Sequence, residues 1–212
     1  EDGRVEIRTG RGQTAVVHSV TLPPFVLVGA TTLPGYLPQP LRDRFETKLS
    51  LEYYTDDELT RIIVGAAESK GAKLDPDSAV LLARRSRGTP RVALRLFTQS
   101  WNLAVVLADT TDTPITVDVA QQALDLEGID EMGLDKDDRA VLTALGKRHR
   151  GGPVGVDNLA ASSGVDNRTL DSAIEPYLLR EGLIRRTTRG RKATELAFLH
   201  LGIECPAHCL DE

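Results

Sequence analysis

Aromatic residues are scarce in this sequence, and long apolar runs are missing. Phe, Trp and Tyr make up 4% of the 212 residues, so any core must be built mainly from Leu, Val, Ile and Ala, which favours helical packing over a β-sandwich. The longest apolar stretches, such as residues 25–30 and 103–107, are far shorter than the ~20 residues of a membrane-spanning helix. No signal-peptide pattern opens the chain. We therefore expect a soluble, cytoplasmic protein that does not interact with membranes.

Cysteine is also rare. Cys205 and Cys209 stand close together in the sequence Cys-Pro-Ala-His-Cys near the end of the chain. A metal site there would lack a fourth ligand and a rigid frame. We expect no metal site, and we expect residues 204–212 to form a frayed tail.

A Gly-rich phosphate-binding loop of the form G-x-x-x-x-G-K-[ST] is missing as well, and so is an acidic strand of the Walker B type. The chain begins with Glu1 in the middle of a pattern, which we interpret as a fragment or a processed chain. The net charge is -5, which argues against a protein that binds polyanions over its whole surface. An average of this kind can still hide a local basic patch.

The first segment has the pattern of an α/β domain. Two short alternating runs in residues 5–22 surround a Gly-rich turn at residues 9–12 and predict a β-hairpin. Residues 25–30 form a short unbroken apolar run that is typical of a strand buried on both faces of a parallel sheet. That run ends at Thr31 and Thr32.

Helical signals dominate the next segment. Thr55 and Glu58 have the spacing of a capping box, and apolar residues follow at helical spacing. Asp75-Pro76 and Thr89-Pro90 each place a capping residue before a proline at the first helical position. A further helix is expected from Thr116 to about Leu126. Four consecutive helices predict a small helical lid, followed by an acidic linker over residues 127–136.

The last segment has the order of a winged helix. Helices are expected over residues 137–149, 158–162 and 168–179, and a basic hairpin follows around residues 188–190. Three helices followed by such a hairpin are typical of a helix-turn-helix variant that binds DNA. Pro176 lies inside the third helix and requires a kink there.

Several strings of this sequence resemble the RuvB family of AAA+ motors that migrate Holliday junctions. They are Leu22-Pro-Pro-Phe-Val-Leu-Val-Gly-Ala-Thr-Thr32 with Pro40-Leu-Arg-Asp-Arg-Phe45, Arg85-Ser-Arg-Gly-Thr-Pro-Arg91, Gly151-Gly-Pro-Val-Gly-Val-Asp-Asn-Leu-Ala160, and Glu175-Pro-Tyr-Leu178 with Arg186-Thr-Thr-Arg-Gly-Arg191. They occur in the family's order and span roughly residues 1–203. Leu33 replaces an arginine that is usual in the family, Thr188 replaces a proline, and the loop over residues 34–38 is unusual.

The resemblance implies an α/β AAA+ ATPase remnant followed by an all-α lid bundle and a C-terminal winged-helix domain. The expected boundaries are residues 1–52 for the ATPase part with its hairpin, 53–132 for the lid, 133–203 for the winged helix and 204–212 for the tail. The implied protein is a subunit of an ATP-driven hexameric ring, a DNA helicase or translocase of recombination and repair. ATP and Mg²⁺ would be held in part by upstream residues and neighbouring subunits, so this fragment alone is expected to be inactive.

The resemblance also assigns roles to residues near the nucleotide. Thr32, next to Thr31, resembles the sensor 1 residue, whereas the residues alone favour two hydroxyls that satisfy backbone groups in a turn. Arg44 resembles an arginine finger offered to the neighbouring subunit. Arg42 is its alternative, Asp43 is expected to restrain one of the two arginines, and a surface ion-pair cluster of little energetic value is the simpler interpretation.

Arg91 follows Pro90 in the first turn of its predicted helix, where the helix dipole already favours an anion. A cation is unfavourable there unless an external anion binds nearby, and the resemblance makes Arg91 the sensor 2 residue. The alternative is an arginine that reaches a carboxylate elsewhere in the protein.

Positive charge gathers on the predicted wing, where no acid interrupts it. The residues expected to contact duplex DNA are Arg186, Thr187, Thr188, Arg189, Arg191 and Lys192, and Arg185 lies beside them. Arg189 is next to Gly190 at the tip and could enter a minor groove. The alternative is a solvated basic edge that discourages aggregation of the sheet.

The N-terminal hairpin, residues 3–22, leaves Val5, Ile7, Val16 and Val20 in need of a partner surface. By resemblance this hairpin contacts a RuvA-like junction-binding protein, and packing on the protein's own sheet is the alternative. Two other kinds of protein remain possible. One is a transcription regulator with a degenerate sensor domain, and the other is an AAA+ protein like a DNA-polymerase clamp loader.

Overall fold

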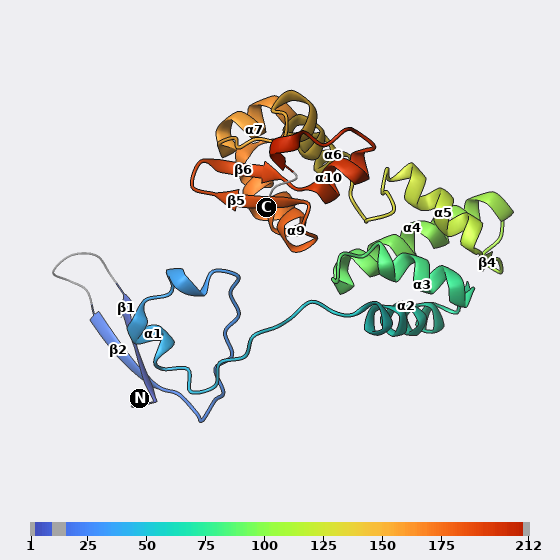
Figure 1. The fold of residues 1–212 in the computed structure, drawn as a ribbon. Helices are drawn as coiled ribbons and strands as arrows, with labels where there is room; N and C mark the ends of the chain where they lie inside the picture. Colours follow the sequence, from blue (N-terminus) through green and yellow to red (C-terminus); the bar gives the residue numbers. More distant parts are fainter. Residues whose placement is uncertain (1–2, 10–15, 210–212) are drawn as a thin grey trace. The chain divides into compact units, whose positions relative to one another are not determined.

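The computed structural model describes residues 3–9 and 16–209 (Figure 1). The chain divides into two compact units, residues 1–51 and residues 52–212.

The first unit contains the predicted β-hairpin. Strands β1 (Arg4–Thr9) and β2 (Val16–Thr21) pair antiparallel, with Val5 opposite Val20 and Ile7 opposite His18. The Gly-rich turn expected at residues 9–12 lies, after Thr9, outside the described residues. Val5, Ile7 and Val20 are all exposed, so the apolar face of the hairpin has no packed partner within the described part of this unit.

The strand predicted over residues 25–30 is wrong for this structure. The segment has no regular secondary structure, and its side chains are exposed, with Phe25 63% and Val26 89% accessible. A buried parallel strand needs neighbours that supply hydrogen bonds and cover both faces, and the described residues of this unit contain no parallel partner for it. The segment continues into a 3-10 turn, η2 (Pro34–Tyr36), and a short helix, α1 (Gln39–Arg42).

The second unit begins with the predicted helical lid. Its helices are α2 (Asp56–Lys70), α3 (Pro76–Arg84), α4 (Pro90–Ala108) and α5 (Val117–Leu126). Both hydrogen bonds of the Thr55–Glu58 capping box are present. The backbone N–H and the hydroxyl of Thr55 both donate to the Glu58 carboxylate and hold its pKa below the ordinary value. Asp75 caps α3 by accepting a hydrogen bond from the backbone N–H of Asp77 at 3.1 Å. The helix starts predicted at Thr55, Asp75 and Thr116 are confirmed with their caps, whereas α4 begins at Pro90 as predicted but has no side-chain cap from Thr89.

The lid core is built almost entirely from aliphatic side chains, as the low aromatic content predicts. Its largest fully buried members are Leu59, Ile63, Leu82, Leu96, Phe97, Ile115 and Leu124. The Trp101 ring stacks on Phe97 with 6.5 Å between centroids, and the Lys70 ammonium lies 5.1 Å from the Trp101 ring centroid. Two short strands that the sequence did not reveal, β3 (Lys73–Leu74) and β4 (Pro114–Ile115), pair in parallel across this core.

The winged-helix domain follows. Its helical segments are α6 (Lys136–Thr143) with the π-helical stretch η3 (Ala144–Arg148), α7 (Val156–Ser163), and α8 (Asn167–Thr169), η4 (Leu170–Ile174) and α9 (Glu175–Arg180) in series. The wing consists of the antiparallel strands β5 (Ile184–Thr187) and β6 (Gly190–Ala193), and α10 (Glu195–Leu201) follows it. A separate core lies between these elements.

The irregularity expected at Pro176 takes the form of a π-helical stretch. Residues 170–174 adopt the wider helix, and Pro176 is one of the first two residues of α9, where its missing N–H removes no intrahelical hydrogen bond. One continuous α-helix over residues 168–179 would instead have lost a hydrogen bond and forced a clash with the preceding turn.

The frayed tail predicted over residues 204–212 is wrong as far as residue 209. Cys209, in the 3-10 turn η5 (Ala207–Cys209), is 7% exposed and belongs to the winged-helix core. It fills a hollow over Gly151, where an added Cβ would lie 2.5 Å from the Cys209 sulfur. The described residues contain no group of three or more His, Cys, Asp or Glu side chains placed to hold a metal ion, and no helix among them is long and apolar enough to cross a membrane.

Gly190 fixes the wing against the segment before α7. Its φ is 133°, and an added Cβ would lie 2.2 Å from the carbonyl oxygen of Val154. The backbones of Val154 and Arg191 exchange hydrogen bonds of 2.8 and 3.0 Å at this point. A side chain at position 190 would therefore break this backbone contact between the wing and the segment before α7.

We predict that Gly190→Ala lowers the free energy of unfolding by on the order of 3 kcal/mol or more, because backbone rather than a flexible side chain must move. Gly182→Ala is the matched control, because Gly182 also has a positive φ, 69°, but open space around its Cβ position. It should cost only about 1–2 kcal/mol. Urea unfolding followed by far-UV circular dichroism measures both, and equal losses would contradict the packing argument.

Candidate functional site

Thr31 and Thr32 end the apolar segment of the first unit, and they differ in their contacts. The Thr31 hydroxyl oxygen accepts a hydrogen bond from the backbone N–H of Leu33 at 3.0 Å, which is the local turn interaction expected of a threonine in this position. Thr32 is exposed, and its side chain makes no hydrogen bond within the described part of the chain. Of the two hydroxyls, that of Thr32 is available to an external group.

The two arginines of the Arg42-Asp43-Arg44 cluster also differ in their contacts. The Arg42 guanidinium donates to the side-chain oxygen of Gln39, and the Gln39 amide donates to the Asp43 carboxylate at 2.6 Å. Asp43 therefore restrains Arg42 through Gln39, a residue that the sequence did not single out. Arg44 is exposed and forms no ion pair or hydrogen bond through its side chain among the described residues. Arg44 is the arginine of this cluster that remains free to meet a phosphate.

Arg91 lies in the first turn of the 19-residue helix α4, which begins at Pro90. Thr89 precedes the helix but does not cap it, because its hydroxyl donates to the Ser86 carbonyl oxygen at 3.2 Å. The first turn contains no acidic residue, and the exposed Arg91 side chain reaches no carboxylate in the described part of the chain. Uncapped N–H groups and an unpaired guanidinium thus lie together, an arrangement that favours a bound anion.

The wing carries its positive charge on both faces. Arg185 lies opposite Lys192 on the two strands, and Arg186 lies opposite Arg191. Like charges directly across a strand pair are destabilising unless other groups compensate them. The two faces differ in the groups that surround these cations.

One face of the wing is held by Glu175, whose side chain is 1% exposed. Arg186 donates to one oxygen of this carboxylate, and Arg191 donates to the other at 3.0 Å from Nε and 2.8 Å from Nη2. The hydrogen bond to Glu175 raises the pKa of Arg186. The hairpin itself contains no acid, but α9 supplies one from outside it, and no local sequence pattern pointed to Glu175 in this role.

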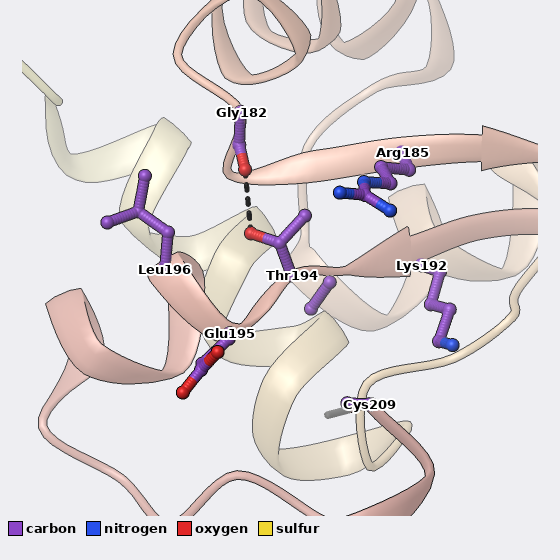
Figure 2. Close-up of a pocket in the computed structure, with 8 residues that line it drawn as sticks. Gly182, Arg185, Lys192, Thr194, Glu195, Leu196 and Cys209 are labelled. Carbon is purple, nitrogen blue, oxygen red and sulfur yellow. Dashed lines mark hydrogen bonds between the residues drawn. The ribbon is translucent and has the colours of Figure 1, made fainter. Parts of the chain in front are cut away.

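The other face of the wing borders a cavity of about 230 Å³. Figure 2 shows Arg185 and Lys192 on the adjacent strands, with Glu195 and Cys209 around the same space. The Thr194 hydroxyl donates to the Gly182 carbonyl oxygen at 2.6 Å and closes one side of it. The cationic side chains of this face thus have a carboxylate among their neighbours.

The tip of the wing is the most accessible part of the basic surface. Thr188 and Arg189 are exposed, and the Arg189 side chain forms no ion pair within the described region. The Thr187 hydroxyl is used locally, since it donates to the Gly190 carbonyl oxygen at 2.8 Å and accepts from the Arg189 backbone N–H at 3.2 Å. Among the residues predicted to contact DNA, Arg189 has the freest cation, whereas Arg186 and Arg191 are bound to Glu175.

The predicted nucleotide residues are divided between the two units. Thr31, Thr32, Arg42 and Arg44 belong to the first unit, whereas Pro90, Arg91 and the wing belong to the second. The hairpin residues Val5, Ile7 and Val20 expose an apolar face in the first unit.

Family profiles match the chain in three consecutive pieces. Residues 1–51 match the Holliday junction DNA helicase RuvB P-loop domain, residues 54–130 the RuvB AAA lid domain, and residues 131–202 the RuvB C-terminal winged helix domain. The match to the P-loop domain covers a part that contains no Gly-rich phosphate loop.

Curated relatives and solved structures agree with these profiles. The Holliday junction branch migration complex subunit RuvB of Corynebacterium diphtheriae is 48% identical over 206 residues, which are 97% of this chain and 56% of the relative. That of Mycobacterium ulcerans is 46% identical over 98% of this chain and 59% of its own length. The Thermotoga maritima RuvB Holliday junction branch migration motor superposes with a TM-score of 0.78 and 43% identity, over 87% of this chain and 61% of that one.

The chain therefore spans somewhat more than half the length of the relatives it matches, and its matches to the P-loop, lid and winged-helix domains follow one another in that order. The three domain matches occur in the family's order, and the identity extends over nearly the whole chain. Together with the lid and winged-helix folds, they show that this chain belongs to the RuvB family of AAA+ proteins.

Proposed function

We propose that this chain acts in a subunit of a hexameric, ATP-driven motor that migrates Holliday junctions during recombination and repair. The observation that carries the proposal is Arg91, an unpaired guanidinium in the uncapped first turn of α4, within a chain whose winged helix presents a second unpaired cation, Arg189. A motor of this kind needs one group that reads the phosphates of a nucleotide and another that holds the DNA backbone.

The residues present suit a nucleotide with bound Mg²⁺ only as a partial site. Arg91 would contact a terminal phosphate from the lid, Thr32 would orient a water or a phosphate oxygen as sensor 1, and Arg44 would reach the nucleotide of the neighbouring subunit. Thr31 and Pro90 shape the backbone beside them. The ligands of Mg²⁺ and the Gly-rich loop are not in the printed sequence, so residues beyond it and neighbouring subunits would complete the site.

Duplex DNA would be bound through its phosphates and shape rather than through its bases. Arg189 and Thr188 would contact the backbone at the wing tip, with Thr187 and Lys192 beside them, while Glu175 keeps Arg186 and Arg191 at a fixed place on the surface. The exposed apolar face of the hairpin over residues 3–22 would dock a RuvA-like junction-binding protein. The proposed division of the chain is an ATPase part over residues 1–52, a lid over residues 53–132, a winged helix over residues 133–203 and a tail over residues 204–212.

The chain by itself should hydrolyse no ATP, because the groups that bind the β- and γ-phosphates and Mg²⁺ are absent from its sequence. The measurement is steady-state phosphate release by the purified chain, with and without duplex DNA. Release above the buffer blank that persists through further purification would contradict this prediction.

Arg44→Ala should act across subunits. In a ring-forming protein in which a family P-loop segment precedes this chain, the substitution should leave nucleotide binding nearly unchanged and lower ATP turnover on the order of a thousandfold. Arg42→Ala is the matched control, because Arg42 is engaged with Gln39, and it should have a much smaller effect.

Mixed rings test the direction of this contact. Subunits with an inactive P-loop but an intact Arg44 should restore turnover in Arg44→Ala neighbours. A failure of this rescue would show that Arg44 does not act on the neighbouring nucleotide.

Arg189→Ala should weaken duplex binding equally for unrelated sequences and reduce the slope of log affinity against log salt by about one. Arg84→Ala, which removes an exposed lid arginine with no partner in the described residues, should leave that slope unchanged. Titration of the chain with several duplexes at two salt concentrations measures both.

A transcription regulator would behave differently. Base-edge contacts from the helix over residues 168–179 would give discrimination of about 1–3 kcal/mol per altered base pair. A strong preference for one duplex, or binding that ignores the loss of Arg189, would favour that function over the motor.

A further inference from the structure

The loop between α3 and α4 is held in an unfavourable backbone conformation. Arg87 has φ 54° and Gly88 has φ 70°. A residue with a side chain adopts such a φ only where surrounding contacts compensate its cost, and such positions concentrate at functional sites. Arg87 stands four residues before Arg91 in the same segment, so whatever holds Arg87 also sets the start of α4.

The contacts of the Arg87 side chain are all with the winged-helix domain. Its Nε donates to the Gly133 carbonyl oxygen at 2.7 Å, and its Nη2 pairs with the Asp138 carboxylate and lies 3.2 Å from Asp135 Oδ2. The guanidinium also lies 4.6 Å from the centroid of the Tyr177 ring. A lid residue thus has its charge paired within the neighbouring domain.

The same loop is bound from its backbone side. Arg180, at the end of α9, donates to the Arg87 carbonyl oxygen at 2.9 Å, and its guanidinium lies 4.1 Å from the centroid of the Tyr53 ring. The backbone N–H of Tyr54 donates to the Gly88 carbonyl oxygen at 2.9 Å. A Cβ on Gly88 would lie 2.9 Å from that of Tyr53, so the entry to the lid, the loop before α4 and the winged helix meet here.

Asp138 makes this contact difficult to open. Its side chain is fully buried, and one carboxylate oxygen receives both Arg87 and the backbone N–H of Asp135. Burial raises the pKa of Asp138 to about 6, because it outweighs the opposing effect of Arg87. At neutral pH, moving the loop away from the winged helix would leave a buried carboxylate without its cation, which is strongly unfavourable.

We propose that Arg87 is a positioning residue that makes the start of α4, with Arg91, move as one body with the winged helix, so that DNA on the wing and phosphate at Arg91 are sensed together. Linkage requires this coupling to be reciprocal. The inference rests on the proposed function, since it needs a winged helix that binds DNA.

Hydrogen–deuterium exchange on the chain as it stands tests the coupling. Adding a saturating 20-base-pair duplex should slow the exchange of backbone amides in residues 89–94 by about threefold, a size typical of coupling between sites. The test variant is Arg87→Met with Asp138→Asn, which removes both charges while keeping side-chain volume, so that no buried charge is left unpaired. Arg84→Ala is the matched control in the same region.

In the double variant the duplex should still bind within about twofold of the wild-type affinity and still protect the wing, but it should no longer change exchange in residues 89–94. Arg84→Ala should behave like the wild type. Circular dichroism establishes that the double variant is folded, and Arg180→Ala supplies an independent break if it is not.

Two outcomes would overturn the inference. A duplex-dependent change in residues 89–94 that persists without Arg87 and Asp138 would show that the coupling takes another route. A wild-type chain that binds the duplex without any change in residues 89–94 would show that no coupling exists. A wild-type chain that binds no duplex at all would instead contradict the proposed function, and the inference would fail with it.

Discussion

The buried carboxylate of Glu175 is the contact on which the placement of the wing depends. A hairpin with arginines and a lysine facing one another across its strands would repel itself, and two of those arginines are drawn to one anion supplied by α9. Two bidentate-capable cations around a single carboxylate leave a net positive charge at a defined position. The geometry of the wing is therefore set by the helix that precedes it, and the tip is left to meet an external anion.

The arginines proposed to contact nucleotide phosphates are, in contrast to Arg186 and Arg191, not paired with a carboxylate in the part of the chain that the structure describes. Arg44 and Arg91 are exposed cations with no anion of their own in the described residues, while their neighbours Arg42 and Arg87 donate to Gln39 and to Asp138. In each pair the occupied arginine stiffens the segment that presents the free one. Such preorganisation lowers the reorganisation needed when charge develops on a bound phosphate.

Local features of the sequence predicted most of the secondary structure. Caps such as Thr55–Glu58 and Asp75-Pro76 depend on residues within one turn, so the sequence carries their whole cause. The strand prediction for residues 25–30 is wrong because a strand forms only beside partner strands. The composition of a segment does not show whether such partners are present. The π-helical stretch before Pro176 was foreseen only as a kink.

A site residue could be predicted from the sequence where its local surroundings offer its charge no partner. Arg91 is out of place in a first helical turn, and the sequence alone exposes that conflict. The sequence did not reveal Glu175 and Asp138 as buried carboxylates, because the arginines that pair with them are distant in sequence. Glu175 pairs with Arg191, and Asp138 pairs with Arg87. Cys209 escaped because its burial depends on the hollow over Gly151.

The composition of the lid has an optical consequence. Trp101 is the single tryptophan of the chain, and it packs on Phe97 beneath the ammonium of Lys70. The winged helix contains no tryptophan, so the tryptophan emission of the whole chain comes from an indole in the domain that is not expected to touch DNA. A change in that emission when duplex is added would be a signal generated at a distance, recorded by a native fluorophore that needs no label.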